Sequence, residues 1–481
     1  MIRVIICFFA ITFSTLLYGQ KEREVVIEGK APFASNCKIR ITTFSDYITW
    51  QPQETAVAKI DKNGDFKLSF KLKQISLVQI SILRSKAEFF ASPGYSYNFQ
   101  IDMDSLGHQS FDPTQQNQYL KISAPEIDTN DINLKINHFN NRLDEILAPY
   151  AYDIMRYNDV TAFDSVCAQV AREFPVLYNP DNYYHSYIFY SLANIERIIY
   201  KKSPKKIYTR YLDNDHILYN NPAYMDFFNG FYDNYLYNSP RIKKSDLEQN
   251  INIEPNYNAL FNAVGKDFLL VNERLREFVI IKNLGQFLGN EEFDAGNILK
   301  LLEHIETTTH FPDHKIFIFN IIQKYKKENF RLETPNFTFK TPKGSDFRFS
   351  KLNGKPVYVQ VFRTDCPDCI REMKLIEELK KTYDEKIEFV SISVDYDITK
   401  FEKFPLSYPE FDWTFVHFND QYSWMDYFEI NSLPEYYLLS EDGNIMQRYA
   451  PAPTKGLSQY LQMHFYEEED VPENPMFQQR N

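Results

Sequence analysis

The sequence is poor in glycine and has no excess of positive charge. It holds only 14 glycines in 481 residues, and its 53 Lys and Arg face 65 Asp and Glu, for a formal net charge of −12. So little glycine argues against linker-rich or low-complexity architecture. Nucleic-acid binding requires clustered Lys and Arg facing phosphates. We therefore expect no nucleic-acid partner.

Cysteine is also scarce, because the chain contains only five. That number is too small for a disulfide scaffold in a chain of this length. Cys37 lies in a strand-like run and Cys167 in a helix-like run, where each is expected to be a small buried apolar residue. A bridge between these two is the alternative. Cys366 and Cys369, in contrast, form a closely spaced pair in "VFRTDCPDCIREM".

The N-terminus has an apolar run, but a short one. Arg3 precedes the run from Val4 to Leu17, and the segment ends in "LYGQ". A run of about 14 residues is shorter than the roughly 20 that span a bilayer, and this pattern is typical of a secretory signal peptide. We predict a signal peptide over 1–19, cleaved after Gly19, and a periplasmic location. An uncleaved membrane anchor is the alternative.

The length favours two to four domains, and the hydrophobic fraction of 44% is enough for a sizeable core. Residues 20–105 contain six alternating runs separated by turn signals, which predict an antiparallel β-sandwich domain. Within it, "DKNGDF" places Asp61 as in a calcium loop, but Phe66 and Leu72 occupy two essential loop positions. Asn63-Gly64 is therefore interpreted as a hairpin turn.

From about Pro113 to Lys327 the pattern changes to a helical period. Residues 106–332 are predicted to form a helical domain, from runs such as "INLKINHFNNRLDEIL" and "AGNILKLLEHI". Its many tyrosines are expected mainly in the core, with a partner groove as the alternative. His304, His310 and His314 resemble a metal cluster, but Pro312 interrupts the helix that would align them. No metal site is predicted.

A strand, helix and strand follow in residues 355–394, as "KPVYVQVF", "CIREMKLIEELKKTY" and "IEFVSISV". This order predicts a βαβ unit inside an α/β domain over 333–468, followed by an acidic tail at 469–481. The overall class is multidomain α+β. The cysteine pair lies at the first strand-to-helix turn.

The position of the pair indicates its chemistry. Pro367 suits the first helical position, so Cys366 should cap the helix, where free amides and the helix dipole stabilise a thiolate. Cys369 lies about one turn further in and should be shielded. An exposed nucleophile beside a resolving thiol is what thiol–disulfide exchange requires. A zinc site would need a second ligand pair, and an inert staple would close too short a loop to add much stability. Both remain as alternatives.

These residues also carry a family resemblance. The segment "NFTFKTPKGSDFRFSKLNGKPVYVQVFRTDCPDCIREM" and the later "YFEINSLPEYYLLSEDGNI" resemble the TlpA/ResA-like thiol–disulfide oxidoreductases of the thioredoxin fold. The match covers a little over a quarter of the chain. The upstream helical and β segments resemble, more weakly, those of larger exported members.

The resemblance implies a role for each matching residue. Cys366 would attack, Cys369 would resolve, and Pro434 would be a cis-proline against the disulfide. Leu433, just before it, would offer its backbone to an extended substrate. Glu372 would manage the protons of the pair. An ordinary trans proline and an exposed helix glutamate are the alternatives.

The sequence also departs from the family pattern. Asp365 replaces the tryptophan that is common before the first cysteine, and Asp368 precedes the second. Two carboxylates should disfavour the Cys366 thiolate and so tune the redox potential, although Arg363 and Arg371 can offset them. Gln360 stands where thioredoxins carry a buried aspartate.

Together these features predict a periplasmic thiol–disulfide oxidoreductase of the reductase or isomerase type. Its partners would be protein thiols or disulfides and a membrane thiol donor, and it would use no cofactor. The upstream domains would recruit the partner. The alternative is a non-catalytic exported binding protein whose thioredoxin-like domain is only a scaffold.

Overall fold

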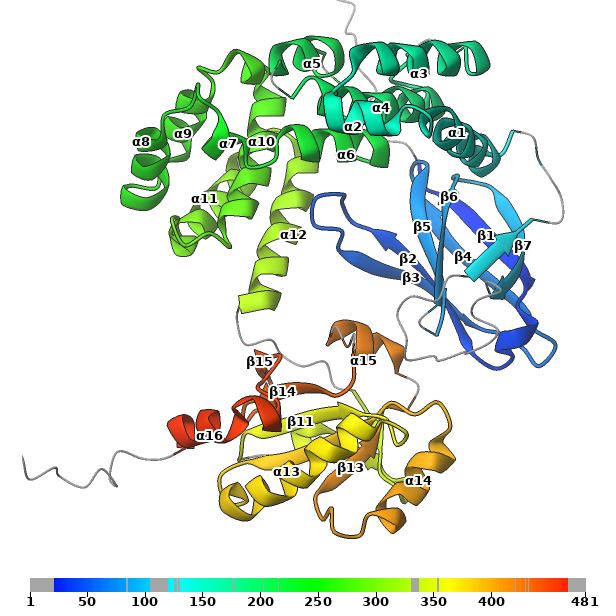
Figure 1. The fold of residues 1–481 in the computed structure, drawn as a ribbon, viewed down its shortest axis with the longest axis vertical. Coiled ribbons are helices and arrows are strands. Elements are labelled where there is room, and N and C mark those ends of the chain that lie inside the picture. The colour runs from blue at the N-terminus through cyan, green and yellow to red at the C-terminus, as the bar shows by residue number, and fades with distance from the viewer. Residues whose placement is uncertain are drawn as a thin grey trace, which may run out of the picture.

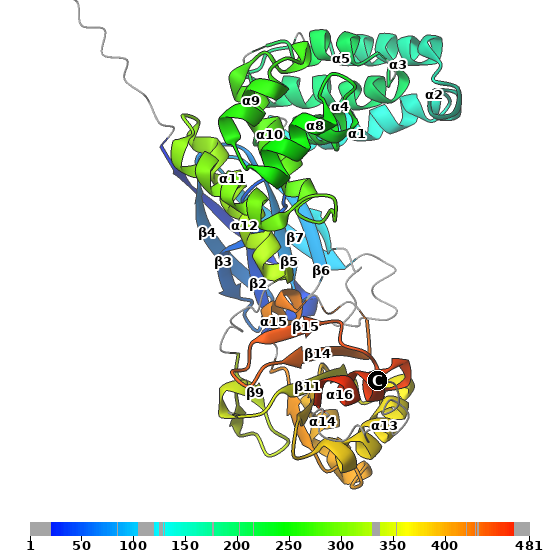
Figure 2. The same cartoon turned by 90° about the vertical axis from the view of Figure 1, so that its left-hand side faces the viewer.

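The computed structural model describes residues 21–465 except 84, 104–119, 125–127, 129, 176–177, 202, 215, 330–336, 353, 420, 429 and 431. The predicted signal peptide and acidic tail both lie outside the described residues. Among the helices that are described, none is long and apolar enough to cross a bilayer. The chain stacks a helical region, a pair of sheets and a C-terminal α/β region one above another (Figures 1 and 2).

The described part of the N-terminal region forms two four-stranded sheets, with orders β4-β1-β7-β8 and β3-β2-β5-β6. Their strands are β1 (Arg23–Lys30), β2 (Lys38–Phe44), β3 (Pro52–Lys59), β4 (Asp65–Leu72), β5 (Ser76–Ile82), β6 (Ser85–Ala91), β7 (Ser96–Met103) and β8 (Leu120–Ser123). The sequence predicted six strands and missed β6 and β8. In β6 the burial does not alternate, since its last three residues are all buried, and β8 is short.

Two details of the predicted antiparallel arrangement are wrong. Strand β1 pairs with β7 in parallel, with Val26 opposite Ser96. The Asn63-Gly64 turn does connect β3 to β4, but these strands belong to different sheets, so the turn is not a hairpin. Gly64 has a φ of +86°, and an added Cβ would lie 2.7 Å from Pro32. Glycine is therefore required there by conformation and by space.

The helical region arches over one end of the sheets (Figure 1). Its α-helices are α1 (Ile132–Leu147), α2 (Ala151–Tyr157), α3 (Val160–Glu173), α4 (Tyr183–Ile199), α5 (Pro204–Tyr211), α6 (Pro222–Phe231), α7 (Tyr235–Asn238), α8 (Lys244–Leu247), α9 (Tyr257–Val264), α10 (Glu273–Phe287), α11 (Ala295–Thr308) and α12 (Pro312–Asn329). Short 3₁₀ or π segments lie at Glu248–Ile253 and Phe268–Leu270. As predicted, Pro312 separates two helices, α11 and α12.

Aromatic side chains form the centre of the helical region. Tyr190, Tyr224, Phe227, Phe228 and Tyr232 are fully buried. The same core includes Tyr47, Leu77 and Phe90 from the sheets, so that the two regions share one hydrophobic cluster. The tyrosines are therefore mainly core residues, as expected from their spacing.

The C-terminal region has a seven-stranded sheet in the order β10-β9-β13-β12-β11-β14-β15. Its elements are β9 (Phe339–Lys340), β10 (Asp346–Phe347), β11 (Val357–Phe362), α13 (Pro367–Tyr383), β12 (Glu388–Ser393), α14 (Ile398–Ser407), β13 (Thr414–His417), α15 (Tyr422–Tyr427), β14 (Glu435–Leu439), β15 (Ile445–Arg448) and α16 (Leu457–Phe465), with short 3₁₀ turns at Phe349–Lys351 and Pro453–Lys455. Strands β11, β12 and β13 are parallel.

Strand β11 is buried on both faces, as its apolar sequence predicted. Val357, Val359 and Val361 share a cluster with Trp424 of α15, whereas Tyr358 packs with Ile376 of α13. The predicted βαβ unit is thus present as β11, α13 and β12, and the first turn of α13 lies at the carboxyl end of β11.

Candidate functional site

The two closely spaced cysteines are joined in a disulfide at the start of α13. Their Cα atoms are 5.3 Å apart. Cys366 is the N-cap of the helix, Pro367 follows at its first position, and the Cys369 N–H donates to the Cys366 sulfur over 3.1 Å. This local structure follows from the sequence, because proline needs no N–H partner at the first helical position.

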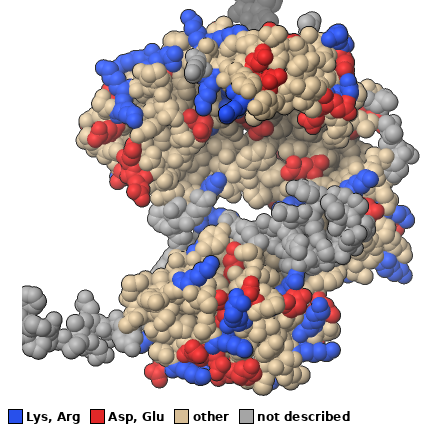
Figure 3. Space-filling model, viewed as in Figure 1, with Lys and Arg blue, Asp and Glu red and all other residues tan. Residues whose placement is uncertain are grey.

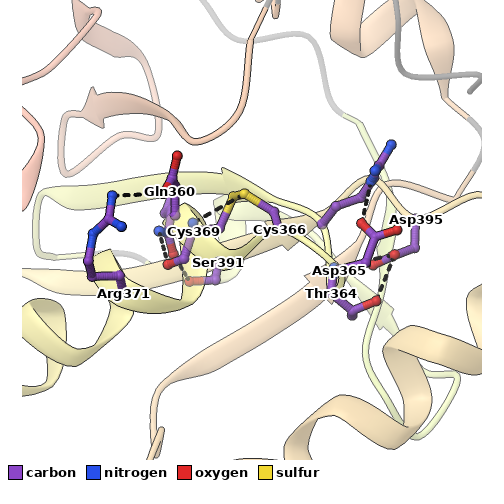
Figure 4. Close-up of a disulfide and its surroundings, with 10 residues drawn as sticks. Gln360, Thr364, Asp365, Cys366, Cys369, Arg371, Ser391 and Asp395 are labelled. Carbon is purple, nitrogen blue, oxygen red and sulfur yellow. Dashed lines mark hydrogen bonds and ion pairs between the residues drawn. A yellow bond between two sulfur atoms is a disulfide. The ribbon is translucent and has the colours of Figure 1, made fainter.

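The two sulfurs lie in different environments. Cys366 is partly exposed, whereas Cys369 is 0% exposed among Phe362, Met373 and Phe401. Figure 4 shows the disulfide that joins Cys366 to Cys369. A molecule in solution can therefore approach only Cys366. At that position the free amides of the helix terminus stabilise an anion.

Glu372 lies one turn further along α13 and is 6% exposed. Its carboxylate accepts hydrogen bonds from the Thr454 hydroxyl (2.6 Å) and the Thr454 N–H (3.1 Å), in the 3₁₀ turn before α16. Burial, followed by the nearby Glu372 charge, raises the pKa of Tyr436 on β14. Glu372 is therefore an interior residue, and the alternative of an exposed helix glutamate is wrong.

Gln360 occupies the centre of β11 beneath the helix start and is fully buried. Its Nε2 donates to the carbonyl of Cys369 over 3.3 Å, and its Oε1 accepts from the Ser391 hydroxyl over 3.2 Å (Figure 4). Trp413 donates in turn to Ser391 over 2.9 Å. This chain of neutral groups holds the first turn of α13 against the sheet without placing a charge there.

The two aspartates beside the pair are each matched by an arginine. Arg363 Nε lies 2.7 Å from Asp365, and Arg371 lies 2.7 Å from Asp368. All four side chains reach the surface, where solvent also screens their fields. The net electrostatic effect of the two aspartates on Cys366 is thus smaller than their number implies.

Asp395 is a residue of the site that the sequence analysis did not identify. It is 3% exposed, and its carboxylate accepts from the Thr364 N–H (3.0 Å), the Thr364 hydroxyl (2.8 Å) and the Ser393 hydroxyl (2.7 Å). His417 lies 2.6 Å from the Asp395 carbonyl. These bonds hold the loop before Cys366 against the ends of β12 and β13. Figure 4 shows Asp395 beside Thr364. The sequence did contain a signal for it, because Asp395 comes just after the buried parallel strand β12.

The peptide bond between Leu433 and Pro434 is cis, as the resemblance implied. Leu433 packs against the aromatic cluster that contains Cys369, and Cys366 contacts the same cluster. Strand β14 follows directly and pairs antiparallel with β11, with Glu435 opposite Val361. The chain at Leu433 is thereby held beside the cysteine pair.

A shallow pocket of about 370 Å³ adjoins the disulfide. It is lined by Thr364, Asp365, Pro367, Ile370, Arg371 and Lys374. Among the described residues there is no group of His, Cys, Asp and Glu that could hold a metal ion.

Cys37 and Cys167 form no disulfide with each other, so the alternative of a bridge between these two cysteines is wrong.

The segment that contains this site is similar to known proteins. Residues 332–463 match the family model described as Redoxin. The chain is 28% identical over 141 residues to the thioredoxin-like protein YneN of Bacillus subtilis, covering 28% of this chain and 82% of that protein. It is also 28% identical over 133 residues to the thiol-disulfide oxidoreductase ResA of Bacillus cereus, covering 27% and 75%.

Solved structures also match. A thiol:disulfide interchange protein from Bacteroides sp. has 16% identity and a TM-score of 0.27, covering 30% of this chain and 95% of that one. A thiol-disulfide oxidoreductase from Bacteroides fragilis has 20% identity and a TM-score of 0.25, covering 27% and 98%. The family match confirms that the chain carries a thioredoxin-like redoxin domain at its C-terminal end.

Proposed function

We propose that this protein is a periplasmic thiol–disulfide oxidoreductase that exchanges disulfides with protein substrates through the CPDC motif of its redoxin domain. The arrangement of the pair carries the proposal: Cys366 is accessible at a helix N-terminus, and Cys369 is fully buried one turn away. The curated relatives named thiol-disulfide oxidoreductases support the same activity.

In the reducing direction, the Cys366 thiolate attacks a disulfide of the substrate. A bond forms between Cys366 and one substrate sulfur, and the other substrate sulfur leaves as a thiolate. Cys369 then gives up its proton and attacks the Cys366 sulfur, which releases the first substrate sulfur and forms the Cys366–Cys369 disulfide. Two electrons pass to the substrate. A membrane thiol donor would restore the dithiol.

Glu372 is proposed as the base that takes the Cys369 proton. It lies on the same face of α13 as Cys369, and both are buried. Its two bonds from Thr454 fix the carboxylate in place. Asp365 and Asp368 are proposed to tune the potential, and the backbone of Leu433 beside Pro434 is proposed to pair with an extended substrate.

The upstream regions are proposed as two further domains, a β-sandwich over 20–105 and a helical domain over 106–332, that recruit or orient the partner protein. The alternative of a non-catalytic binding protein is not favoured. Two acidic neighbours of Cys366 would support that alternative by disfavouring the thiolate, but each of them has an arginine partner.

A trapping experiment tests the activity. Cys369→Ser leaves Cys366 able to attack but unable to be released, so mixed disulfides with substrates should accumulate in cells and disappear on reduction. The matched control is the Cys366→Ser, Cys369→Ser double variant, which should trap nothing. Recovery of no cysteine-linked protein, together with an oxidised pair that does not react with glutathione, would contradict the proposal.

A further inference from the structure

A cavity of about 1240 Å³ lies where the N-terminal sheets meet the helical region. Its walls come from the start of β1, the turns after β4 and β6, the first turns of α1 and α4, and the segment before α6. No residue of the redoxin domain is among those that line it. It is thus a site separate from the cysteine pair.

The charge of this cavity is opposite to that of the whole chain. Its lining includes Lys21, Arg23, Lys73 and Lys135, against Asp181 as its acidic residue. Acidic residues outnumber basic ones in the chain as a whole, by 65 to 53. On the face drawn in Figure 3, in comparison, the two signs are interspersed over the helical region and the redoxin domain. A local excess of positive charge in an acidic protein favours an anionic ligand.

Most of these cations are available to bind. Lys73 lies 3.9 Å from Glu22, which is a long and exposed pair. Lys21, Arg23 and Lys135 have no ion-pair partner within 4.0 Å in the part of the chain that the structure describes. A ligand would therefore not have to displace existing carboxylates from these three side chains, which favours binding.

The walls of the cavity are fixed by hydrogen bonds between the two regions. Asn220, before α6, donates to the carbonyl of Ile75 over 3.3 Å and accepts from the Tyr183 hydroxyl over 3.3 Å. Asn133 of α1 bonds both the N–H (2.6 Å) and the carbonyl (2.9 Å) of Phe90 in β6. The cavity is therefore held open by the fold itself, and the free-energy cost of ordering its walls on ligand binding is small.

The distribution of polar groups indicates an extended ligand rather than one compact anion. The four cations come from three elements: the start of β1, the turn after β4, and α1. Helices α4 and α6 also begin at the wall, capped by Asn182 and Asn221, and helix N-termini favour negative charge. The volume exceeds the roughly 300 to 1000 Å³ of most small-molecule pockets. Tyr95 and Tyr184 add aromatic surface for side chains.

We propose that this basic junction pocket binds an extended acidic segment of a partner protein, with several Asp or Glu side chains reaching separate cations. The concave shape suits a polypeptide segment better than a flat lipid surface. The inference does not depend on the redox chemistry, since the pocket shares no residue with the cysteine pair.

The probe is a fluorescein-labelled decapeptide rich in Glu, titrated with the purified full chain and followed by anisotropy. Binding is expected, and it should weaken between about 50 and about 300 mM salt because these charges are exposed. A peptide with Gln in place of every Glu should not bind. Equal binding of the Gln peptide would overturn the proposal, and so would competition by inorganic phosphate at concentrations equal to those of the peptide's carboxylates.

Variants locate the binding. Arg23→Glu with Lys135→Glu should weaken binding by about tenfold or more, because each change replaces an attraction with a repulsion. Lys315→Glu is the control for each single change, Arg23→Glu or Lys135→Glu, which should already weaken binding. It makes the same charge reversal on an exposed residue of α12 outside the pocket, and should bind as the parent does. Arg23→Gln provides a milder second variant if the double variant unfolds. Equal weakening by Lys315→Glu would show only a general field effect and would overturn the assignment.

The same proteins separate this inference from the proposed activity. The pocket variants should exchange disulfides at the parent rate with glutathione, and Cys366→Ser should bind the peptide unchanged. Loss of peptide binding in Cys366→Ser would contradict the independence of the two sites.

Discussion

The redoxin domain and the helical region both bury ionisable side chains, but in the redoxin domain two of them lie on the elements that hold an accessible cysteine. In the helical region, Glu277 accepts hydrogen bonds from His314 (2.7 Å) and Tyr257 (2.8 Å), and also from Thr309. Burial raises the pKa of Glu277, but these bonds outweigh it and the pKa is lowered. This network ties α9 and α10 to the segment that begins α12, and no cysteine takes part.

The cysteines differ in the same way. Cys167 lies inside α3, where burial raises the pKa of its thiol to about 11, so it stays protonated and unreactive at neutral pH. Cys366 caps α13 and is partly exposed. A shifted pKa or a buried ionisable side chain alone therefore does not identify a catalytic site in this protein. What distinguishes the redoxin domain is that two of its buried carboxylates lie on the elements that hold a partly exposed cysteine. Glu372 belongs to the helix that Cys366 caps, and Asp395 bonds Thr364 in the loop before it.

The largest expected effect is on the cysteines themselves. Cys366→Ser should abolish reduction of a disulfide peptide, because no other cysteine among the described residues caps a helix, whereas Cys167→Ser should keep the parent rate. The measurement is the initial rate of thiol release with a dithiol donor present. If Cys366→Ser keeps a substantial rate, the assignment of the nucleophile is wrong.

Two of the buried glutamates, Glu372 and Glu277, should affect different properties: the first the exchange rate, the second the stability. Glu372→Gln should slow resolution of the mixed disulfide by about 10² to 10⁴, the range for loss of a general base, while Cys366 still attacks. Stopped-flow measurement of the two steps tests this. Glu378→Gln, an exposed position on the same helix, is the matched control.

Glu277→Gln should give the opposite result. It leaves the exchange rate unchanged but lowers stability by about 1 to 3 kcal/mol, because a buried hydrogen-bond network loses its charged acceptor. Denaturant unfolding measures the loss. A stability loss in Glu372→Gln equal to that in Glu277→Gln, with no change in rate, would remove the distinction between the two regions.

Lys282 sharpens the comparison further, because it is a buried cation of α10 without a functional neighbour. It is 3% exposed, its ammonium donates to the Tyr232 carbonyl over 3.2 Å, and burial lowers its pKa from 10.5 to about 8. Between these values the unfolded chain binds more protons than the folded one. Stability should therefore rise with pH from about 8 to about 10.5.

Lys282→Met should remove that rise and stabilise the protein at pH 7 by about 2 to 3 kcal/mol. This magnitude is the lowering of the Lys282 pKa, at about 1.36 kcal/mol per pKa unit, minus about 1 kcal/mol for the hydrogen bond that is lost. Thermal unfolding at pH 7 and pH 10 measures both effects. The exchange rate should not change. An Lys282→Met protein that is less stable than the parent at pH 7 would show that the ammonium is better accommodated than its burial implies.

The smallest expected effect concerns Asp368. Asp368→His should stabilise the Cys366 thiolate and raise the reduction potential, but by less than about 30 mV, the value of a tenfold change in equilibrium. The Arg371 partner and the exposure of both side chains keep the effect small. Equilibration with glutathione measures it. A fall in potential would contradict the electrostatic interpretation.

The sequence alone determined the elements that depend on local rules. The period of 3.6 predicted the helices that became α1 and α11, and apolar runs around a helix predicted β11, α13 and β12. The cap at Cys366 followed from Pro367, since capping depends on neighbours within one turn. The family resemblance added the cis bond before Pro434.

Tertiary structure alone decided what depends on contacts between distant residues. Strands β3 and β4 adjoin in sequence but enter different sheets, and β1 pairs in parallel with β7. Glu372 is buried because Thr454, 82 residues away, supplies its hydrogen bonds, and Asp395 holds a loop 31 residues before it. The basic junction pocket likewise joins cations from β1 and α1. The periodicity of the sequence does not predict such long-range contacts, because they depend on how the layers pack and not on the spacing of neighbouring residues.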